Sequence, residues 1–164
     1  MYKILEAKEL ANSIYLFVVE AKRCAASCEP GQFVIVRTTE DGERIPLTVC
    51  DYDRNAGTVT IVVQTIGAST LEMKNFKAGD FFHDFVGPLG QASEFIKEDA
   101  EELKKKKILF VAGGLGTAPV YPQVKWLHEK GVDVDVIVGA KTKDMVIMEE
   151  EMKAVSGNLY VTTD

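Results

Sequence analysis

The chain has 164 residues, 46% of them hydrophobic, and a formal net charge of −6 at pH 7. This length and composition are typical of a globular protein with one domain or two small ones. The negative charge argues against nucleic acid as a partner, because phosphate binding needs a basic surface. No stretch approaches the roughly 20 apolar residues that span a bilayer, so we expect no membrane partner and a cytoplasmic protein.

The three cysteines, Cys24, Cys28 and Cys50, are an odd number, which disfavours a disulfide scaffold. Cys24 and Cys28 lack a second pair of ligands at metal-site spacing, and both histidines are distant in the sequence. We therefore expect reduced, structural cysteines and no metal site. Cys50 follows a candidate ligand segment and either contacts a ligand there or packs in the core.

The first hundred residues are typical of a small antiparallel barrel or sandwich. Turn sequences at residues 29–31, 40–42 and 54–57 separate runs that are rich in β-branched residues. These runs predict strands over residues 13–20, 32–37, 58–65 and 81–86. Gly87-Pro88-Leu89-Gly90 is expected to end the last of them, and residues 69–76 predict a helix capped by Ser69 or Thr70.

From Lys107 the pattern changes to strand, helix, strand, helix, strand. We expect strands over residues 108–112, 132–138 and 159–162, with helices over 117–130 and 144–154. This order predicts a truncated, Rossmann-like parallel sheet of three strands. We expect two domains, residues 1–97 and 98–164. So small a sheet leaves an apolar edge, so either the chain is a fragment of a longer protein or another chain covers that edge.

Three glycines follow the expected strand that ends at Ala112. Gly113, Gly114 and Gly116 remove side chains where a diphosphate needs close approach to the backbone. Pro119 suits the first turn of the next helix, whose N-terminus can hold an anion. The run departs from GxGxxG at its last position, so an ordinary turn with glycines that only allow packing remains an alternative.

Two segments of the first half are further candidates for a ligand site. Arg44-Ile45-Pro46-Leu47-Thr48 can set a hydroxyl against a flat heterocycle and a guanidinium against a diphosphate. Thr65-Ile66-Gly67-Ala68-Ser69-Thr70 combines a strand end, a glycine turn and a helix start, which again suits an anion. The alternatives are an edge strand with an exposed arginine and a helix cap that binds nothing. Two anion sites, one in each half, indicate two phosphate-bearing ligands.

These segments, in this order, resemble the ferredoxin–NADP reductase superfamily. The likeness extends over the whole chain and is closest to the branch that holds two kinds of electron-transfer subunit. One is the small subunit of NADH-dependent reduced ferredoxin:NADP oxidoreductase, also called sulfide dehydrogenase, and the other is the electron-transfer subunit of dihydroorotate dehydrogenase. Glu43–Asp51 and Val138–Asp144 resemble the first of these more.

The resemblance implies an FAD-binding barrel followed by an NAD(P)-binding α/β domain. Pro46, Leu47 and Thr48 are expected against the isoalloxazine, and Arg44 near the FAD diphosphate. Thr65, Gly67, Ser69 and Thr70 belong to the loop that binds the same diphosphate. NAD(H) or NADP(H) is expected on the second loop, formed by Gly113, Gly114, Gly116, Thr117 and Ala118. A 2Fe–2S cluster is expected only in a C-terminal part that this sequence lacks.

The function implied is an FAD-dependent oxidoreductase subunit that passes electrons between NAD(P)H and an iron–sulfur or flavoprotein partner. The partner would be a larger catalytic or electron-accepting subunit, and the exposed strand edge could also pair two copies. An electron-transfer subunit serving pyrimidine synthesis is the alternative within this class. A non-catalytic interaction module is the alternative from another class. No residue has the setting of a general acid, base or nucleophile, so we name no catalytic residue.

Overall fold

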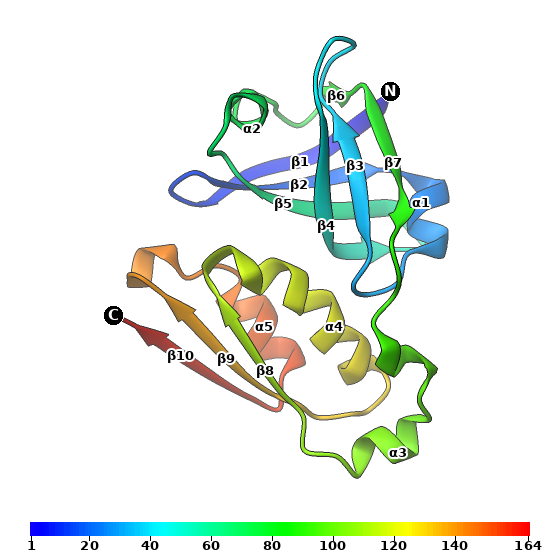
Figure 1. The fold of residues 1–164 in the computed structure, drawn as a ribbon, viewed down its shortest axis with the longest axis vertical. Coiled ribbons are helices and arrows are strands. Elements are labelled where there is room, and N and C mark those ends of the chain that lie inside the picture. The colour runs from blue at the N-terminus through cyan, green and yellow to red at the C-terminus, as the bar shows by residue number, and fades with distance from the viewer.

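The computed structural model describes residues 1–164, which form three layers (Figure 1). A seven-stranded antiparallel sheet curls into a nearly closed barrel. Helices α4 and α5 lie below it, and a three-stranded parallel sheet lies below the helices. The expected fold class, an antiparallel barrel followed by a small parallel α/β sheet, is confirmed.

The barrel comprises β1 (Tyr2–Ala11), β2 (Ile14–Glu20), β3 (Phe33–Arg37), β4 (Arg44–Asp53), β5 (Thr58–Gln64), β6 (Phe81–Phe82) and β7 (Asp84–Leu89). Their order in the sheet is β6-β1-β2-β5-β4-β3-β7. Helix α1 (Lys22–Ser27) joins β2 to β3, and α2 (Ala68–Met73) follows β5. Alternate residues of the strands point inward, so Phe17, Val34, Val49 and Ile61 meet in one buried cluster.

The second half begins after a short 3₁₀ turn, η1 (Glu94–Lys97), and helix α3 (Ala100–Lys104). It contains β8 (Leu109–Gly113), the 3₁₀ turn η2 (Gly114–Gly116), α4 (Thr117–Glu129), β9 (Asp135–Ala140), η3 (Lys143–Met145), α5 (Glu149–Val155) and β10 (Asn158–Thr163). The strands are parallel in the order β10-β9-β8. Every expected strand and helix of this half is present, with shifted ends.

The shifts have local causes. Helix α4 ends in a Schellman motif, in which Gly131 has a φ of 74° and the Val132 N–H donates to the Leu127 carbonyl. Val132 therefore belongs to the helix end, and β9 starts only at Asp135. Helix α5 starts at Glu149 because Met148 takes a left-handed conformation, with a φ of 56°.

The barrel departs from the sequence expectation at several points. Strand β7 runs through Gly87-Pro88 to Leu89 instead of stopping there. It lies at the edge of the sheet and pairs only with β3, where a residue without an N–H is tolerated. Strand β1 and helix α1 were not expected, because their mixed polar sequences hide the buried positions. The cap of α2 is Gly67, not Ser69 or Thr70.

One hydrophobic cluster joins the barrel to the α/β part. Ala11, Ile14 and Val62 of the barrel pack in it with residues of α4, α5 and the parallel sheet. The Lys125 ammonium of α4 also pairs with the Asp51 carboxylate of β4 at 2.8 Å. The two halves are therefore packed against each other. The boundary at residues 97 and 98 stays a prediction.

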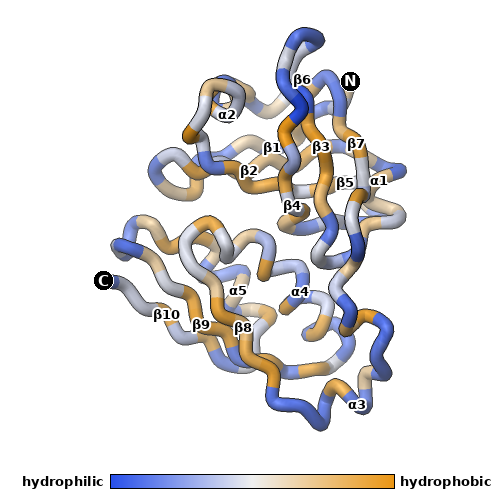
Figure 2. Tube along the Cα trace, in the orientation of Figure 1, coloured by the Kyte–Doolittle hydropathy of each residue, from blue (hydrophilic) through white to orange (hydrophobic).

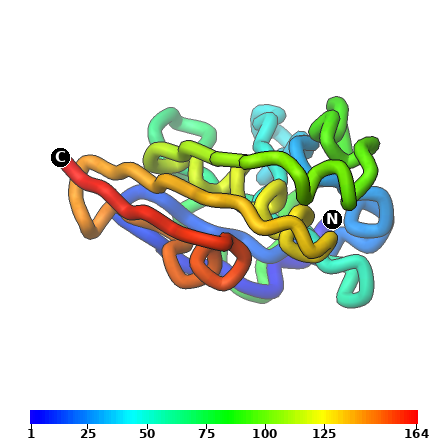
Figure 3. Tube along the Cα trace, turned by 90° about the horizontal axis from the view of Figure 1, so that it is seen from below, coloured from blue at the N-terminus to red at the C-terminus, as the bar shows by residue number.

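The lower face of the parallel sheet carries no helix (Figure 3). The hydropathy colouring marks β8 and β9 as hydrophobic strands (Figure 2). On the open face, Val111 is 69% exposed and Tyr160 is 56% exposed, and both lie in register with Ile137 of β9. None of the helices combines the length and the hydrophobicity needed to cross a lipid bilayer.

Candidate functional site

Strand β4 presents three of the predicted site residues on one face. Arg44, Pro46 and Thr48 are exposed, whereas the residues between them point toward the barrel core. The side chain of Leu47 is half-buried and packs against the barrel cluster. Strand alternation therefore separates Leu47 from Pro46 and Thr48, and only the latter two have side chains on the outward face.

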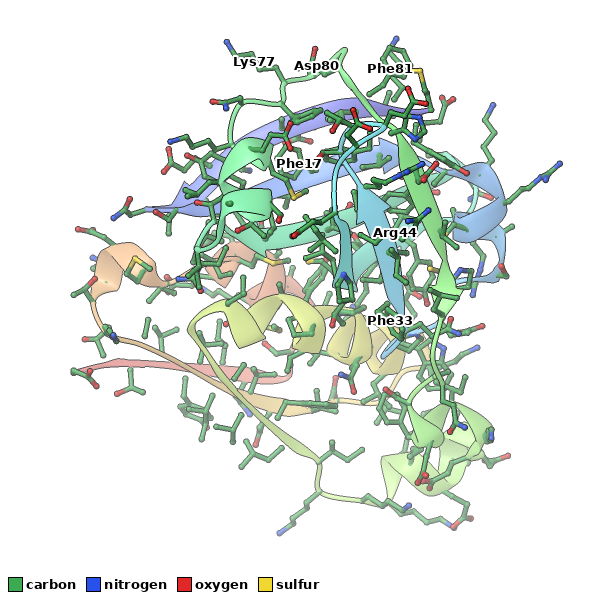
Figure 4. The ribbon with its side chains drawn as sticks, turned by 45° about the horizontal axis from the view of Figure 1, so that its top comes forward. Phe17, Phe33, Arg44, Lys77, Asp80 and Phe81 are labelled. Carbon is green, nitrogen blue, oxygen red and sulfur yellow. The ribbon has the colours of Figure 1, made fainter.

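Strand β3 extends this face with Phe33, Ile35 and Arg37, which pair with Thr48, Pro46 and Arg44. Figure 4 shows Phe33 and Arg44 at opposite ends of the paired strands. An aromatic ring beside Thr48 is a stacking surface for a flat heterocycle. Sequence reasoning missed Phe33, although its place in an alternating strand was the available signal.

Arg37 is paired with His83 and with Asp84, the first residue of β7. Its Nε donates to Asp84 Oδ2 at 2.7 Å, and its Nη2 lies 3.1 Å from His83 Nδ1. Partial burial opposes ionisation of Asp84, but Arg37 and His83 outweigh it, and the pKa of Asp84 is lowered. Arg44 has no such partner and is exposed. The outward face therefore has one guanidinium free to meet an anion.

The loop before α2 is organised by Thr70. Its Oγ1 accepts hydrogen bonds from the Ile66 and Gly67 N–H groups at 3.0 and 3.1 Å, and donates to the Gly67 carbonyl. The backbone N–H groups of the next three residues, Ala68, Ser69 and Thr70, have no acceptor in the protein. A Cβ on Gly67 would meet nothing within 4 Å. The loop thus combines unused donors with open space.

The acidic side chain of Glu43 contacts this loop. Glu43 Oε2 accepts a hydrogen bond from the Ser69 hydroxyl, which ties the start of β4 to the start of α2. A negative charge beside a helix start lies where a phosphate group would also be stabilised. Glu43 is a second residue that sequence reasoning missed, because its partner is 26 positions away.

Thr65 and Cys50 have structural roles. Thr65 is buried at the end of β5, where its N–H donates to the Ser13 carbonyl at 2.9 Å. It anchors the strand end that leads into the Gly67 loop. Cys50 is fully buried, and its Sγ lies 3.5 Å from Met148 Sδ. Of the two roles expected for Cys50, the structure supports core packing.

The glycines of the turn between β8 and α4 have no protein atoms close to the positions that side chains would take. Added Cβ atoms on Gly113, Gly114 and Gly116 would meet nothing within 4 Å. Packing therefore does not explain these glycines, and of the three only Gly114 has a positive φ, 53°. Leu115 packs against the hydrophobic cluster that joins the barrel to the α/β part, so the turn is held at the boundary between the two halves.

Thr117 begins α4 and is fully buried, as Ala118 nearly is. The Thr117 Oγ1 is buried without a hydrogen-bond partner. A buried hydroxyl left unpaired costs about 1–3 kcal/mol, so such groups usually have a partner in the working protein. This orphaned hydroxyl at a helix N-terminus fits a polar ligand at the turn.

A cavity of about 370 Å³ opens at the carboxyl ends of the parallel strands. Gly113 and Gly114 line it from β8 and η2, Lys141 lines it just after β9, and Thr162 lines it from β10. Ligands of open parallel sheets bind at this edge. The η2 turn also packs beside β5, the strand that leads into the Gly67 loop. The two candidate loops therefore lie on neighbouring elements.

No protein-family profile matches the chain. A protein of Clostridium beijerinckii, known only as an uncharacterized protein in the adh 3′ region, is 60% identical over 164 residues, which are the whole chain and 55% of that protein. A homologue of the electron transfer subunit of dihydroorotate dehydrogenase B (NAD(+)) from Thermotoga maritima is 38% identical over 162 residues, which are 99% of the chain and 55% of the relative.

A solved structure of NADH-dependent reduced ferredoxin-NADP oxidoreductase superposes with a TM-score of 0.88. It is 38% identical and covers the whole chain and 57% of its own length. In sequence and in fold the chain is therefore similar to electron-transfer subunits and oxidoreductases of the ferredoxin–NADP reductase type. It spans little more than half the length of these relatives.

Proposed function

We propose that the chain is the flavin- and nucleotide-binding part of an oxidoreductase subunit that transfers electrons between NAD(P)H and a partner protein. Residues 1–97 would hold FAD, and residues 98–164 would form the first part of the NAD(P) site. The relatives named as electron-transfer subunits and the superposed oxidoreductase support this role. The cytoplasmic location expected from the sequence stays a prediction.

The observation that carries the proposal is the open space at the glycines of both loops. Gly67, Gly113, Gly114 and Gly116 all lie where a side chain would meet no protein atom within 4 Å. Packing does not require glycine at these positions, and at Gly67, Gly113 and Gly116 a positive φ does not require it either, which supports close approach of a ligand to the backbone. Unused N–H groups at one loop and the orphaned Thr117 hydroxyl at the other add polar partners for phosphate or ribose oxygens.

In the barrel, the chain's own residues would bind and orient the flavin. Arg44 and the free N–H groups of Ala68, Ser69 and Thr70 would hold the diphosphate. Pro46, Thr48 and Phe33 offer a flat, partly apolar surface for the ring, and Leu47 would support it from the barrel side. Gly67 leaves room for the diphosphate and Thr65 anchors the strand that leads to it.

In the second half, Gly113, Gly114 and Gly116 would let the nucleotide approach the backbone, and Thr117 and Ala118 would contact it at the start of α4. FAD, when bound, supplies the acceptance of hydride from the nicotinamide and the release of single electrons. The protein contributes binding, orientation and charge, and no residue is assigned as a general acid or base.

A second candidate within this class is the electron-transfer subunit of a dihydroorotate dehydrogenase. It is favoured by the names of the Thermotoga maritima relative and of a Bacillus cereus relative that is 34% identical over 163 residues. The two candidates differ in the larger subunit that accepts the electrons. Purifying the native complex and identifying that subunit by mass spectrometry separates them.

The proposed partner is a larger subunit, with an iron–sulfur centre or a flavin as electron acceptor. The open face of the parallel sheet and its unpaired strand edges are also suited to contact with another polypeptide, including a second copy of the chain. An interaction module without cofactors remains the competing hypothesis, and it rests on the same open face.

The test is the visible absorption spectrum of the purified protein after incubation with excess FAD and removal of free FAD. We expect retained flavin bands that bleach on addition of NADH or NADPH under anaerobic conditions. Retained flavin without bleaching would mean that nucleotide binding needs residues outside this chain. Loss of all flavin from a folded sample would contradict the FAD assignment and favour the interaction module.

A further inference from the structure

Lys141 lines the cavity at the carboxyl ends of the parallel strands, together with Gly113 and Gly114 of the glycine turn. It follows directly after β9, which is the central strand of the sheet. Its ammonium group forms no ion pair with any carboxylate of the protein. The cavity therefore contains a cation whose charge no protein group neutralises.

Strand register sets how far Lys141 lies from the glycine turn. Gly139 of β9 pairs with Gly113 of β8, and neighbouring strands are about 4.8 Å apart. Lys141 is two residues beyond Gly139, which adds about 6.6 Å along the strand direction, toward the edge where the turn also lies. A lysine side chain is a flexible four-carbon stem that ends in three donors. Its ammonium group can therefore reach a ligand held at the turn.

The start of α4 has few backbone donors left for an anion. The Thr117 N–H already donates to the Gly114 and Leu115 carbonyls, and Pro119 has no N–H. The unpaired Thr117 hydroxyl supplies one polar partner. A diphosphate carries more than one negative charge, so a cation beside the turn would add the charge-assisted hydrogen bonds that the backbone does not supply.

Position distinguishes Lys141 from the other exposed lysines of this half. Among the residues that line the cavity, Lys141 is the base and Asp164 is the acid, and no ion pair joins them. Lys143 is two residues further along in η3, is exposed, and does not line the cavity. The two lysines therefore form a matched pair with the same charge and different access to the turn.

We propose that Lys141 binds the diphosphate of the nucleotide held at the η2 turn. This inference rests on the proposed function, because it assumes that the turn binds NAD(H) or NADP(H). The ammonium group would donate charge-assisted hydrogen bonds to the diphosphate oxygens. Since NADH and NADPH share the diphosphate, Lys141 contributes equally to the binding of both and does not select between them.

The test is isothermal titration of the wild type, Lys141→Gln and Lys143→Gln with NADH and with NADPH, at low and at high salt. We expect Lys141→Gln to weaken the binding of both nucleotides about 5- to 20-fold and to reduce the dependence of binding on salt. Lys143→Gln removes the same charge and should bind both nucleotides as the wild type does. Both side chains are exposed, so melting curves should not change.

Chemical labelling gives a second readout that needs no variant. Acetic anhydride acetylates accessible lysines, and peptide mapping by mass spectrometry follows the acetylation of Lys141 and Lys143 in the wild type. Saturating NADH should slow the acetylation of Lys141 and leave that of Lys143 unchanged, because only the first ammonium group would be covered by the diphosphate.

The outcomes separate this inference from the proposed function. Unchanged nucleotide binding in Lys141→Gln, or acetylation of Lys141 that NADH does not slow, would overturn the inference and leave the proposed function intact. A loss of binding confined to NADPH would overturn the diphosphate assignment in favour of the 2′-phosphate. Failure of the wild type to bind either nucleotide would overturn the proposed nucleotide site, and this inference with it.

Discussion

The Gly67 loop of the barrel and the Gly113–Gly116 turn of the parallel sheet both consist of a strand end, a glycine turn and a helix start. They differ in the side chains that hydrogen-bond within them. In the barrel, Thr70 bonds the loop from within and Glu43 stands at the helix start. In the parallel sheet, no protein atom lies within 4 Å of the Cβ positions of the three glycines, and the Thr117 hydroxyl has no hydrogen-bond partner. If both loops bind phosphate-bearing ligands, as proposed, a ligand at the first must compete with the Glu43 carboxylate, whereas the second offers an unpaired hydroxyl.

The largest effect is expected from Gly116→Val, which should weaken nucleotide binding without weakening FAD binding. If the η2 turn binds the nucleotide as proposed, Gly116→Val should weaken NAD(P)H binding by at least about 100-fold, because the valine side chain would fill the space at the turn. Its conformation, φ −60° and ψ −14°, suits any residue, so thermal stability should stay unchanged. Isothermal titration with NADH and NADPH, together with a melting curve, measures both.

Gly67→Val is the matched control for Gly116→Val. Its backbone is extended and its Cβ position is open, so it should fold equally well and lose FAD instead of nucleotide. If either variant weakened both ligands to the same degree, the assignment of one loop to each ligand would be wrong.

Arg44→Ala should weaken FAD binding by about 10- to 100-fold, since hydrogen bonds to charged groups contribute about 1.5–3 kcal/mol. Stability should not change, because Arg44 is exposed and unpaired. Fluorescence titration of FAD at low and high salt measures the effect, which should shrink as salt rises. Lys8→Ala removes an equally exposed charge from β1 and should leave the affinity for FAD unaltered.

Glu43→Gln should act in the opposite direction and strengthen FAD binding about three- to fivefold, since an exposed charge is worth up to about 1 kcal/mol. The amide removes the negative charge that competes with the diphosphate at Ser69. The same titration measures it, with Glu40→Gln at the exposed hairpin tip as control. Weaker binding in Glu43→Gln would mean that the carboxylate supports the loop instead of competing for it.

The smallest effect concerns the ion pair between Arg37 and Asp84, at the edge of the proposed FAD face. Because the folded state lowers the pKa of Asp84, its stabilising contribution is present above the ordinary carboxyl range and disappears as pH falls through it, below about pH 4. Asp84→Asn should therefore reduce the drop in melting temperature between about pH 6 and about pH 3. Asp41→Asn, an exposed change in the β3–β4 hairpin, should leave that drop as in the wild type.

Much of this organisation was predictable from the order of residues. Dense β-branched runs separated by turns indicate the barrel strands, and the alternation after Lys107 indicates the parallel sheet. Glycines after a strand also mark both loops. Strand β1 and helix α1 could not be found in this way, because each has only a few buried residues. The role of Pro88 depended on its place in an edge strand, which only sheet pairing shows.

The sequence by itself indicated most of the strands and helices and where the candidate ligand loops begin, because periodicity and glycine turns are local properties. The tertiary structure decided which side chains share a surface. It turned Leu47 inward, set Phe33 beside Thr48, and brought Glu43 to Ser69. It also left the space around the glycines empty, as the proposed ligand binding requires. Such facts depend on strand register and on contacts between distant residues, which no local pattern encodes.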